Sequence, residues 1–576
     1  AETRRAAREP AMGRRCTGRQ HDQGHGEQER ADEPGQHGVG QATRDGAAGH
    51  AAEHEGRRPA AHDGPVDAAA PDLRPRRGHG GRDDGGEGGR DGHRRRHRGG
   101  HALHFEQQQQ RGYDHDAAAD AEQTAEEART GADGRAGREQ GGIEFAHGSS
   151  GPRGEKAASL RRPVMNLYER IRRAAAAHGD AVAFDCDDGR VLTHAELHGR
   201  IGALAGRLLA AGVVPGDRVV AQVEKSVDAV ALYLATLRVG AVFVPLNTAY
   251  TAAELEYFVG DAEPRVLVCA PERLEAVGAA AAAAGAAPQL LTLDQAGGGS
   301  LVEGIDGEQG DAPASVVRAD DDLAAILYTS GTTGRSKGAM LTHGNLTANA
   351  TTLRRIWGWQ PDDVLLHVLP VYHVHGLFVA LHCALLEPSP VLFHRRFDAA
   401  AVVAALPRAR VFMGVPTHYV RLLEETAFDR DACSGMRLFV SGSAPLRPET
   451  FAAFEARTGM RILERYGMTE AGMITSNPLD GARIAGTVGP ALPDVELRLV
   501  DEEGRVLEPG EIGTVQIRGP NVFAGYWRMP EKTRAEFDGD WFVTGDLGQC
   551  DASGRLSIVG RGKDLVISGG LNVYPR

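Results

Sequence analysis

The first hundred residues of this 576-residue chain have almost no large apolar side chains. Among Leu, Ile, Val, Met, Phe, Trp and Tyr, that stretch contains only Met12, Val39, Val66 and Leu73. A segment with so little apolar surface to bury cannot offset the entropy that its backbone loses on ordering. We therefore predict that residues 1–164 are a disordered, low-complexity extension, of the kind that mistranslated upstream sequence would give. Globular sequence is expected to begin at Met165.

Deletion of residues 1–164 should leave the globular part intact, because the extension supplies no core. We expect residues 165–576 to melt at the temperature of the full chain, and protease to cut the extension first. A melting temperature many degrees lower after deletion, measured by scanning calorimetry, would contradict this.

Thirteen of the 23 histidines lie in the extension, but without the regular spacing of metal ligands, so we expect no metal site there.

The sequence also lacks paired cysteines, long apolar runs and a net positive charge, and each of these absences argues against a class of protein. The six cysteines form no CxxC pair, which is typical of a reducing cytoplasm and not of a disulfide framework or a structural metal site. No apolar run approaches the length of a membrane span. A net charge of -13 and a pI near 6.0 argue against nucleic acid as a main partner. We predict a cytoplasmic protein that binds neither nucleic acid nor membrane.

From Met165 onward, apolar runs typical of strands alternate with amphipathic segments typical of helices. In residues 192–213, for example, Thr193 is the predicted N-cap of a long helix and Gly212 its end. Such alternation predicts parallel sheets covered by helices, and the shorter strands after about residue 484 predict an antiparallel unit. The expected fold is α/β, with two doubly wound, mostly parallel sheets and a small antiparallel β subdomain. The predicted subdomains are 165–318, 319–483 and 484–564.

The segment TSGTTGRSKG, residues 329–338, follows the apolar run LAAIL, which is typical of a buried strand. Its glycines allow the backbone to approach a ligand closely, and its hydroxyl groups and Lys337 offer donors to phosphate oxygens. The common NTPase loop is excluded because Gly338, and not Ser or Thr, follows the lysine. A flexible turn without a ligand is the alternative. The pattern resembles the phosphate loop of the adenylate-forming superfamily, which includes acyl-CoA synthetases, adenylation domains and luciferases.

Five further segments resemble motifs of this superfamily and occur in the required order: LPVYHVHG (369–376), SGSAPL (441–446), ERYGMTE (464–470), TGD (544–546) and GRGKD (560–564). Neither a redox Rossmann enzyme nor a non-enzymatic scaffold explains this series. The resemblance implies a nucleotide site in a large AMP-binding domain, residues 165–564. Its predicted nucleotide-binding residues are Thr329, Ser330, Gly331, Thr332, Thr333, Gly334, Lys337, Ser443, Ala444, Glu464, Tyr466, Gly467, Asp546 and Arg561.

The resemblance also implies individual roles. Tyr466 is expected to stack on adenine, and Asp546 to bind the ribose hydroxyls. The predicted catalytic residues are Lys337, His373 beside the carboxylate substrate, Thr469 at the α-phosphate, and Glu470, which would also hold Mg²⁺. The implied reaction uses ATP to convert a carboxylic acid into an acyl-adenylate, and the thiol of CoA then displaces AMP to give an acyl-CoA.

Several segments resemble malonyl-CoA synthetases in particular, among them ERYGMTEAGMITSNPLDGARIAGTVG. A dicarboxylate needs a cation for its second carboxylate, and arginine can bind it through two hydrogen bonds. We predict that Arg421 is this ligand, with His375 and Arg483 as helpers, and that the substrate is malonate or methylmalonate. The alternatives are a short- or medium-chain fatty acyl-CoA synthetase, an enzyme that serves a carrier protein, and an inactive fragment that only binds nucleotide.

The sequence ends at Arg576, soon after Asp564, the position of the superfamily's hinge. Members of the superfamily continue into a small C-terminal domain, which supplies a lysine for adenylation and part of the thiol-binding surface. We interpret residues 565–576 as the hinge remnant of a truncated domain, and we expect turnover to suffer more than binding.

Overall fold

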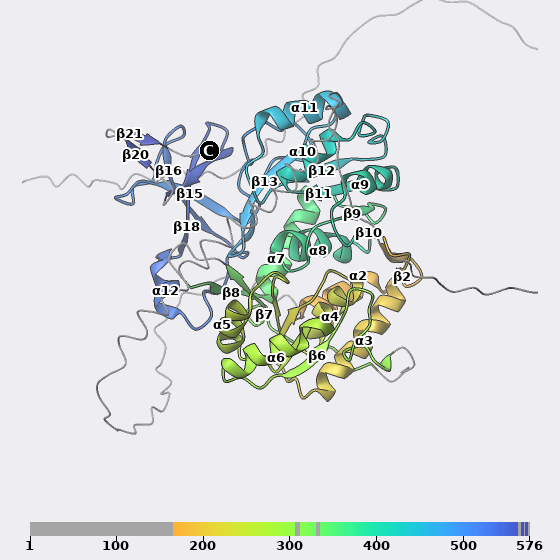
Figure 1. The fold of residues 1–576 in the computed structure, drawn as a ribbon. Coiled ribbons are helices and arrows are strands. Elements are labelled where there is room, and N and C mark those ends of the chain that lie inside the picture. Colours follow the sequence, from red (N-terminus) through yellow and green to blue (C-terminus); the bar gives the residue numbers. More distant parts are fainter. Residues whose placement is uncertain (1–164, 306–311, 330–334, 563–565, 569–570, 574–576) are drawn as a thin grey trace, which may run out of the picture. The chain divides into compact units, whose positions relative to one another are not determined.

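The computed structural model describes residues 165–305, 312–329, 335–562, 566–568 and 571–573 (Figure 1). The predicted phosphate-loop residues Ser330, Gly331, Thr332, Thr333 and Gly334 lie outside the described residues, as do the extension 1–164 and Asp564. No helix in the described ranges is long and apolar enough to cross a membrane. The predicted fold class is confirmed: the described residues form two mostly parallel sheets, one larger antiparallel sheet and a two-stranded antiparallel sheet.

The first sheet has the order β6-β5-β3-β4-β7-β8. All its neighbours are parallel except β7 and β8, which form an antiparallel hairpin around the phosphate loop. Alternate strand residues point to opposite faces, so Val220 packs against α5 and α6, whereas Val219 and Ala221 face the side of α4. The bounds are β3 (Arg218–Gln222), α4 (Val227–Arg238), β4 (Val242–Pro245), α5 (Ala252–Ala262), β5 (Val266–Cys269), α6 (Leu274–Ala283), β6 (Gln289–Thr292), β7 (Leu323–Thr329) and β8 (Lys337–Thr342).

The second sheet has the order β14-β13-β12-β11-β9-β10-β1-β2, and only its outer pairs are antiparallel. One face packs against α9, α10 and α11. The bounds are β1 (Val182–Cys186), β2 (Val191–Thr193), β9 (Leu365–His367), β10 (Val391–Phe393), α9 (Ala399–Ala405), β11 (Val411–Gly414), α10 (Pro416–Glu424), β12 (Leu438–Ser441), α11 (Pro448–Thr458), β13 (Leu463–Met468) and β14 (Gly472–Ser476).

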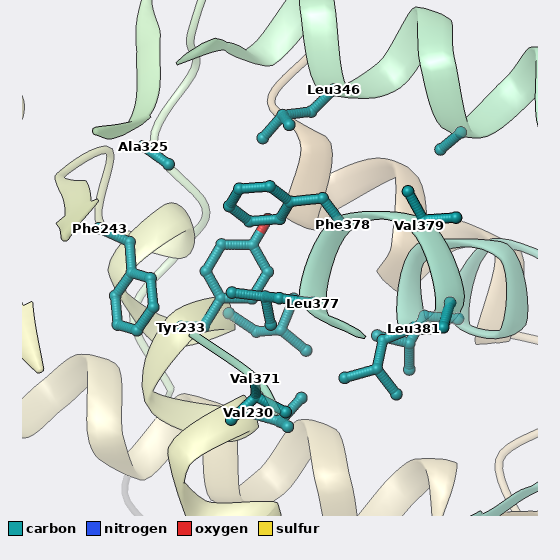
Figure 2. Close-up of a cluster of buried hydrophobic side chains, with 14 of the residues drawn as sticks. Val230, Tyr233, Phe243, Ala325, Leu346, Val371, Leu377, Phe378, Val379 and Leu381 are labelled. Carbon is teal, nitrogen blue, oxygen red and sulfur yellow. The ribbon is translucent and has the colours of Figure 1, made fainter. Parts of the chain in front are cut away.

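One apolar core joins the two sheets. Figure 2 shows Tyr233 from α4, Phe243 from β4 and Ala325 from β7 converging with Phe378 of the second half of the chain. The helices in this core are α2 (Leu167–Ala175), α3 (His194–Ala210), α4, α7 (His343–Ile356), the π-helical segment η3 (His375–Ala380) and α8 (Leu381–Leu386). The helix ends predicted for α3 are confirmed: Thr193 is the N-cap of a capping box with Glu196, and Gly212 follows the helix with a φ of 75°.

The strands do not follow the predicted subdomain boundary at residue 318. β1 and β2 belong to the second sheet, because β1 pairs in parallel with β10, with Phe184 opposite Val391. β7 and β8, which flank the phosphate loop, belong to the first sheet, because β7 pairs with β4. The division of the chain into the three predicted subdomains stays a prediction.

The third sheet is antiparallel, with the order β15-β16-β18-β17 and with β19 also paired to β18. A loop of this part runs beside β8: the Met340 amide donates to the Gly525 carbonyl (2.9 Å) and the Trp527 amide to the Gly338 carbonyl (2.7 Å). This pairing places Tyr526 next to Lys337 and Ala339. The bounds are β15 (Glu496–Val500), β16 (Ile512–Arg518), α12 (Pro530–Ala535), β17 (Phe537–Asp538), β18 (Trp541–Cys550) and β19 (Leu556–Arg561). A separate antiparallel pair is formed by β20 (Val566–Ser568) and β21 (Leu571–Val573).

Candidate active site

The predicted phosphate end of the site lies where the β7–β8 hairpin meets the turn between β13 and β14. Thr329 ends β7 and its hydroxyl lies 3.5 Å from a carboxylate oxygen of Glu470. The Tyr526 hydroxyl donates to the same oxygen at 3.0 Å. Lys337 begins β8, is buried, and its ammonium lies 4.4 Å from the centre of the Tyr526 ring. The fold therefore brings together three predicted residues, Thr329, Lys337 and Glu470.

Glu470, the predicted Mg²⁺ ligand, is a buried carboxylate, and burial raises its pKa above the ordinary value. Within the described parts of the chain, His, Cys, Asp and Glu form no group of three or more that could hold a metal ion by themselves. Mg²⁺ commonly takes only one or two carboxylates from a protein and fills its other positions with phosphate oxygens and water. One carboxylate next to a phosphate loop fits that pattern.

The predicted nucleoside end of the site is formed by β13, β18 and β19. The Tyr466 hydroxyl donates to Asp546 Oδ2 at 2.5 Å, and Arg561 Nε lies 3.2 Å from Asp546 Oδ1. The three residues come from parts of the sequence up to 95 positions apart, and each was predicted to bind nucleotide. Burial, with Asp546 as the next cause, raises the pKa of Tyr466 well above its usual range, so its hydroxyl stays a donor. This cluster can hold the Tyr466 ring in one orientation.

Close backbone packing determines which residues can occupy the segments around Tyr466. A Cβ on Gly467 would lie 2.2 Å from the Gly472 carbonyl oxygen, so only glycine fits the β13–β14 turn that carries Thr469. Thr469 is half-buried and Ala444 is exposed. Ser443, in the loop that follows β12, has a φ of 69°, which is strained for a residue with a side chain.

Glu464 on β13 is buried, and one of its oxygens accepts a hydrogen bond from the Gly486 amide at 3.2 Å. Desolvation raises its pKa from 4.5 to about 7. The structure therefore places a partly protonated carboxyl group beside Tyr466 near neutral pH.

Glu464 should make the stability of the protein depend on pH. Between pH 4.5 and about 7 the folded protein keeps a proton that the unfolded chain has released, so stability falls as the pH rises through this window. The loss is roughly 3 kcal/mol at about 1.4 kcal/mol per pKa unit. Denaturant titrations from pH 4.5 to 8 should therefore show wild type losing stability relative to Glu464→Gln as the pH rises. A difference between the two proteins that stays constant with pH would contradict the prediction.

The predicted acid end of the site contains His373 and His375, which follow β9. His375 is buried; its Nδ1 lies 3.3 Å from the Ser443 hydroxyl, and its Nε2 has no hydrogen-bond partner in the part of the chain that the structure describes. Burial holds the pKa of His375 well below 6.5, and the nearby Arg465 and His418 lower it further. His373 is exposed and its ring packs against that of Tyr372. The His375 imidazole is therefore neutral, and one of its ring nitrogens is buried with its hydrogen-bonding capacity unused by the described residues.

Arg465 is a site residue that the sequence analysis missed. It lies on β13 between Glu464 and Tyr466 and is 3% exposed, yet its Nε and Nη2 atoms have no hydrogen-bond partner among the described residues. Burial lowers its pKa to about 10. A Cβ on Gly442 would lie 2.2 Å from Arg465 Nη1, so the guanidinium lies against bare backbone. The available signal was a second charged residue, directly after Glu464, in a strand whose first three residues are buried.

The two arginines predicted to bind substrate have other contacts. Arg483 donates to the backbone carbonyls of Pro478, Leu479 and Arg461 at 3.1, 2.6 and 2.6 Å, which fixes the loop after β14. Arg421 on α10 lies 4.9 Å from the ring centre of Phe397, and that ring stacks on His418. The roles of both arginines in substrate binding stay predictions.

The fold and the two ends of the site define an adenylate-forming acyl-CoA ligase. A family model described as "AMP-binding enzyme" matches residues 171–527, and the chain belongs to that family. The feruloyl-CoA synthase of an Amycolatopsis species is 38% identical, over 67% of this chain and 77% of its own length. The mitochondrial malonate–CoA ligase ACSF3 of Homo sapiens is 36% identical, over 69% of this chain and 76% of its own length.

Among solved structures, ATP-bound MatB from Rhodopseudomonas palustris is 51% identical and covers 71% of this chain and 82% of its own, with a TM-score of 0.69. The predicted resemblance to acyl-CoA synthetases, with malonate–CoA ligases among them, is thus confirmed. Because the relatives are named for different acids, the comparisons establish an ATP-dependent acyl-CoA ligase but not its acid.

Proposed function

We propose that this protein activates a dicarboxylic acid, malonate or methylmalonate, as an acyl-adenylate and transfers it to CoA. The observation that carries this proposal is the unpaired guanidinium of Arg465 beside the neutral ring of His375. The ATP-dependent ligation of an acid to CoA comes from the family. The choice of acid rests on this buried guanidinium, together with the likeness to malonate–CoA ligase and to MatB.

A buried charge without a partner is costly to the folded protein, whereas a buried charge with a bidentate partner of opposite charge is compensated. Nε and Nη2 are adjacent donors on one edge of the guanidinium, which matches the two oxygens of a carboxylate. A dicarboxylic acid can fill this position with its second carboxylate while its first one reacts. A fatty acid or an aromatic acid would leave the guanidinium desolvated and unpaired.

The other predicted residues have roles that suit this reaction. The acid's reactive oxygen would attack the α-phosphorus of ATP, with His373 beside it and Thr469 and Lys337 holding the negatively charged phosphates. Mg²⁺, bound through Glu470, would supply further neutralisation of phosphate charge. Tyr466, Asp546 and Arg561 would hold the nucleoside while pyrophosphate leaves. The CoA thiol would then attack the acyl carbon and release AMP.

Comparing acids of different chemistry tests the proposal. Pyrophosphate release from ATP is measured with malonate, propionate, octanoate and ferulate, each titrated to saturation with the full chain. We expect malonate to give the highest kcat/KM for pyrophosphate release, and propionate a far lower one. Equal activity with propionate, or a preference for octanoate or ferulate, would refute the dicarboxylate assignment. ATP binding without any acid-dependent release would favour a fragment that only binds nucleotide.

A further inference from the structure

Lys337, the cation of the phosphate loop, has an anionic partner within the protein. Its ammonium lies 3.3 Å from Glu536 Oε1, and the Lys337 side chain is only 10% exposed. Glu536 follows α12 and is far from the loop in sequence. The loop of residues 524–527 that pairs with β8 brings this segment to the site. No motif of the phosphate loop predicts this contact.

A second lysine binds the same carboxylate oxygen. Lys532, one turn earlier, has its ammonium 2.9 Å from Glu536 Oε1. Glu536 is therefore shared between Lys532, which is more exposed, and the buried Lys337. If Lys337 moved away, Glu536 would still be paired with Lys532, so its half-buried carboxylate would not be left without a cation.

Glu470 is near the same pair. The Tyr526 ring lies against the Lys337 ammonium, and its hydroxyl donates to Glu470. Burial and, to a smaller extent, the charge of Glu536 raise the pKa of Glu470, whereas hydrogen bonds and charge from Lys532 and Lys337 leave the pKa of Glu536 below its ordinary value despite its burial. The arrangement thus contains two carboxylates and one buried ammonium. The phosphates of ATP would add further negative charge here, and the buried Lys337 ammonium is a cation that can pair with them. ATP and Glu536 therefore compete for one ammonium group.

We propose that Glu536 is the resting counter-ion of Lys337, and that ATP binds by exchange: Lys337 leaves Glu536 for a phosphate oxygen while Lys532 retains Glu536. No covalent bond changes in this step. Glu536 is then a positioning residue, which holds Lys337 at the loop before the nucleotide arrives and weakens nucleotide binding in return. The inference rests on the proposed role of Lys337 in binding the phosphates of ATP.

The test compares charge variants of the full chain. The Kd for MgATP is measured by calorimetry without any acid, and the melting temperature is measured without nucleotide. In Glu536→Gln we expect MgATP to bind several-fold more tightly while the ligand-free protein melts at a lower temperature. In Lys532→Met, Glu536 depends on Lys337 alone, so MgATP should bind several-fold more weakly. Glu531→Gln, at an exposed position of α12, is the control and should change neither quantity.

Opposite changes in the two variants are the signature of exchange, because a merely structural salt bridge would weaken binding in both. Weaker MgATP binding in Glu536→Gln would overturn the proposal. It would indicate instead that Glu536 binds the metal or stabilises the fold. Unchanged affinity in both variants would also overturn it. If Glu536→Gln fails to fold, unaltered or tighter binding by Lys532→Met refutes the exchange by itself. Failure of the unmodified chain to bind MgATP would refute the proposed function, and the exchange with it.

Discussion

Replacing Arg465 with methionine should abolish tight binding of malonate and leave the binding of MgATP nearly unchanged. Removing one partner of a buried, hydrogen-bonded charge pair costs about 2–5 kcal/mol. The Kd for malonate should therefore rise about 30-fold to several thousand-fold. The ligand-free variant should be at least as stable as wild type, because the substitution removes a buried guanidinium that has two unpaired donors.

This combination separates a ligand-binding arginine from a structural one. A structural arginine would lower the melting temperature when it is replaced, whereas Arg465 should not. Arg461→Met, at an exposed position just before β13, is the matched control and should change neither affinity nor stability by much. Calorimetric titration of malonate into both variants, together with thermal melts, makes the comparison. A folded Arg465→Met protein that binds malonate like wild type would remove Arg465 from the site.

Replacing Lys337 with methionine should slow adenylate formation by about 10²–10³-fold, since a preorganised group that stabilises transition-state charge commonly contributes about 2.7–4 kcal/mol. The relevant charge develops on the phosphates, so the binding of malonate should change little. The malonate-dependent exchange of pyrophosphate into ATP measures this step without CoA. Arg335→Met is the control, because Arg335 is an exposed cation of the same hairpin. A Lys337→Met protein with an exchange rate within about threefold of wild type would contradict the assigned role.

The sequence predicted those parts of the fold and site that depend on local pattern. Thr193 and Gly212 mark the ends of α3 because capping depends on a few neighbouring residues. Tyr466, Asp546 and Arg561 were predicted together because each lies in a short motif, and the structure brings them into contact. The sheet to which β1 belongs was not predictable in this way, because strand pairing with β10 joins segments about 200 residues apart.

Arg465 and Glu536 were missed for a related physical reason. Whether an arginine is solvated or buried without a partner depends on what packs around it. For Arg465 that includes Gly442, which lies on the preceding strand connection. Glu536 meets Lys337 only because the loop of 524–527 pairs with β8. Arg421 was predicted from the resemblance to malonyl-CoA synthetases, and sequence alone does not reveal that its guanidinium lies over the Phe397 ring.

The central claim is that the pocket around Arg465 recognises a second carboxylate. Two non-hydrolysable acyl-adenylate analogues, malonyl and propionyl, test it most directly, because they share the nucleoside and differ only in that carboxylate. Both are titrated into the full chain by calorimetry at one pH and one salt concentration. We predict that the malonyl analogue binds at least about 30-fold more tightly, the lower limit expected for a buried charge pair. Equal affinity for the two analogues would contradict the account.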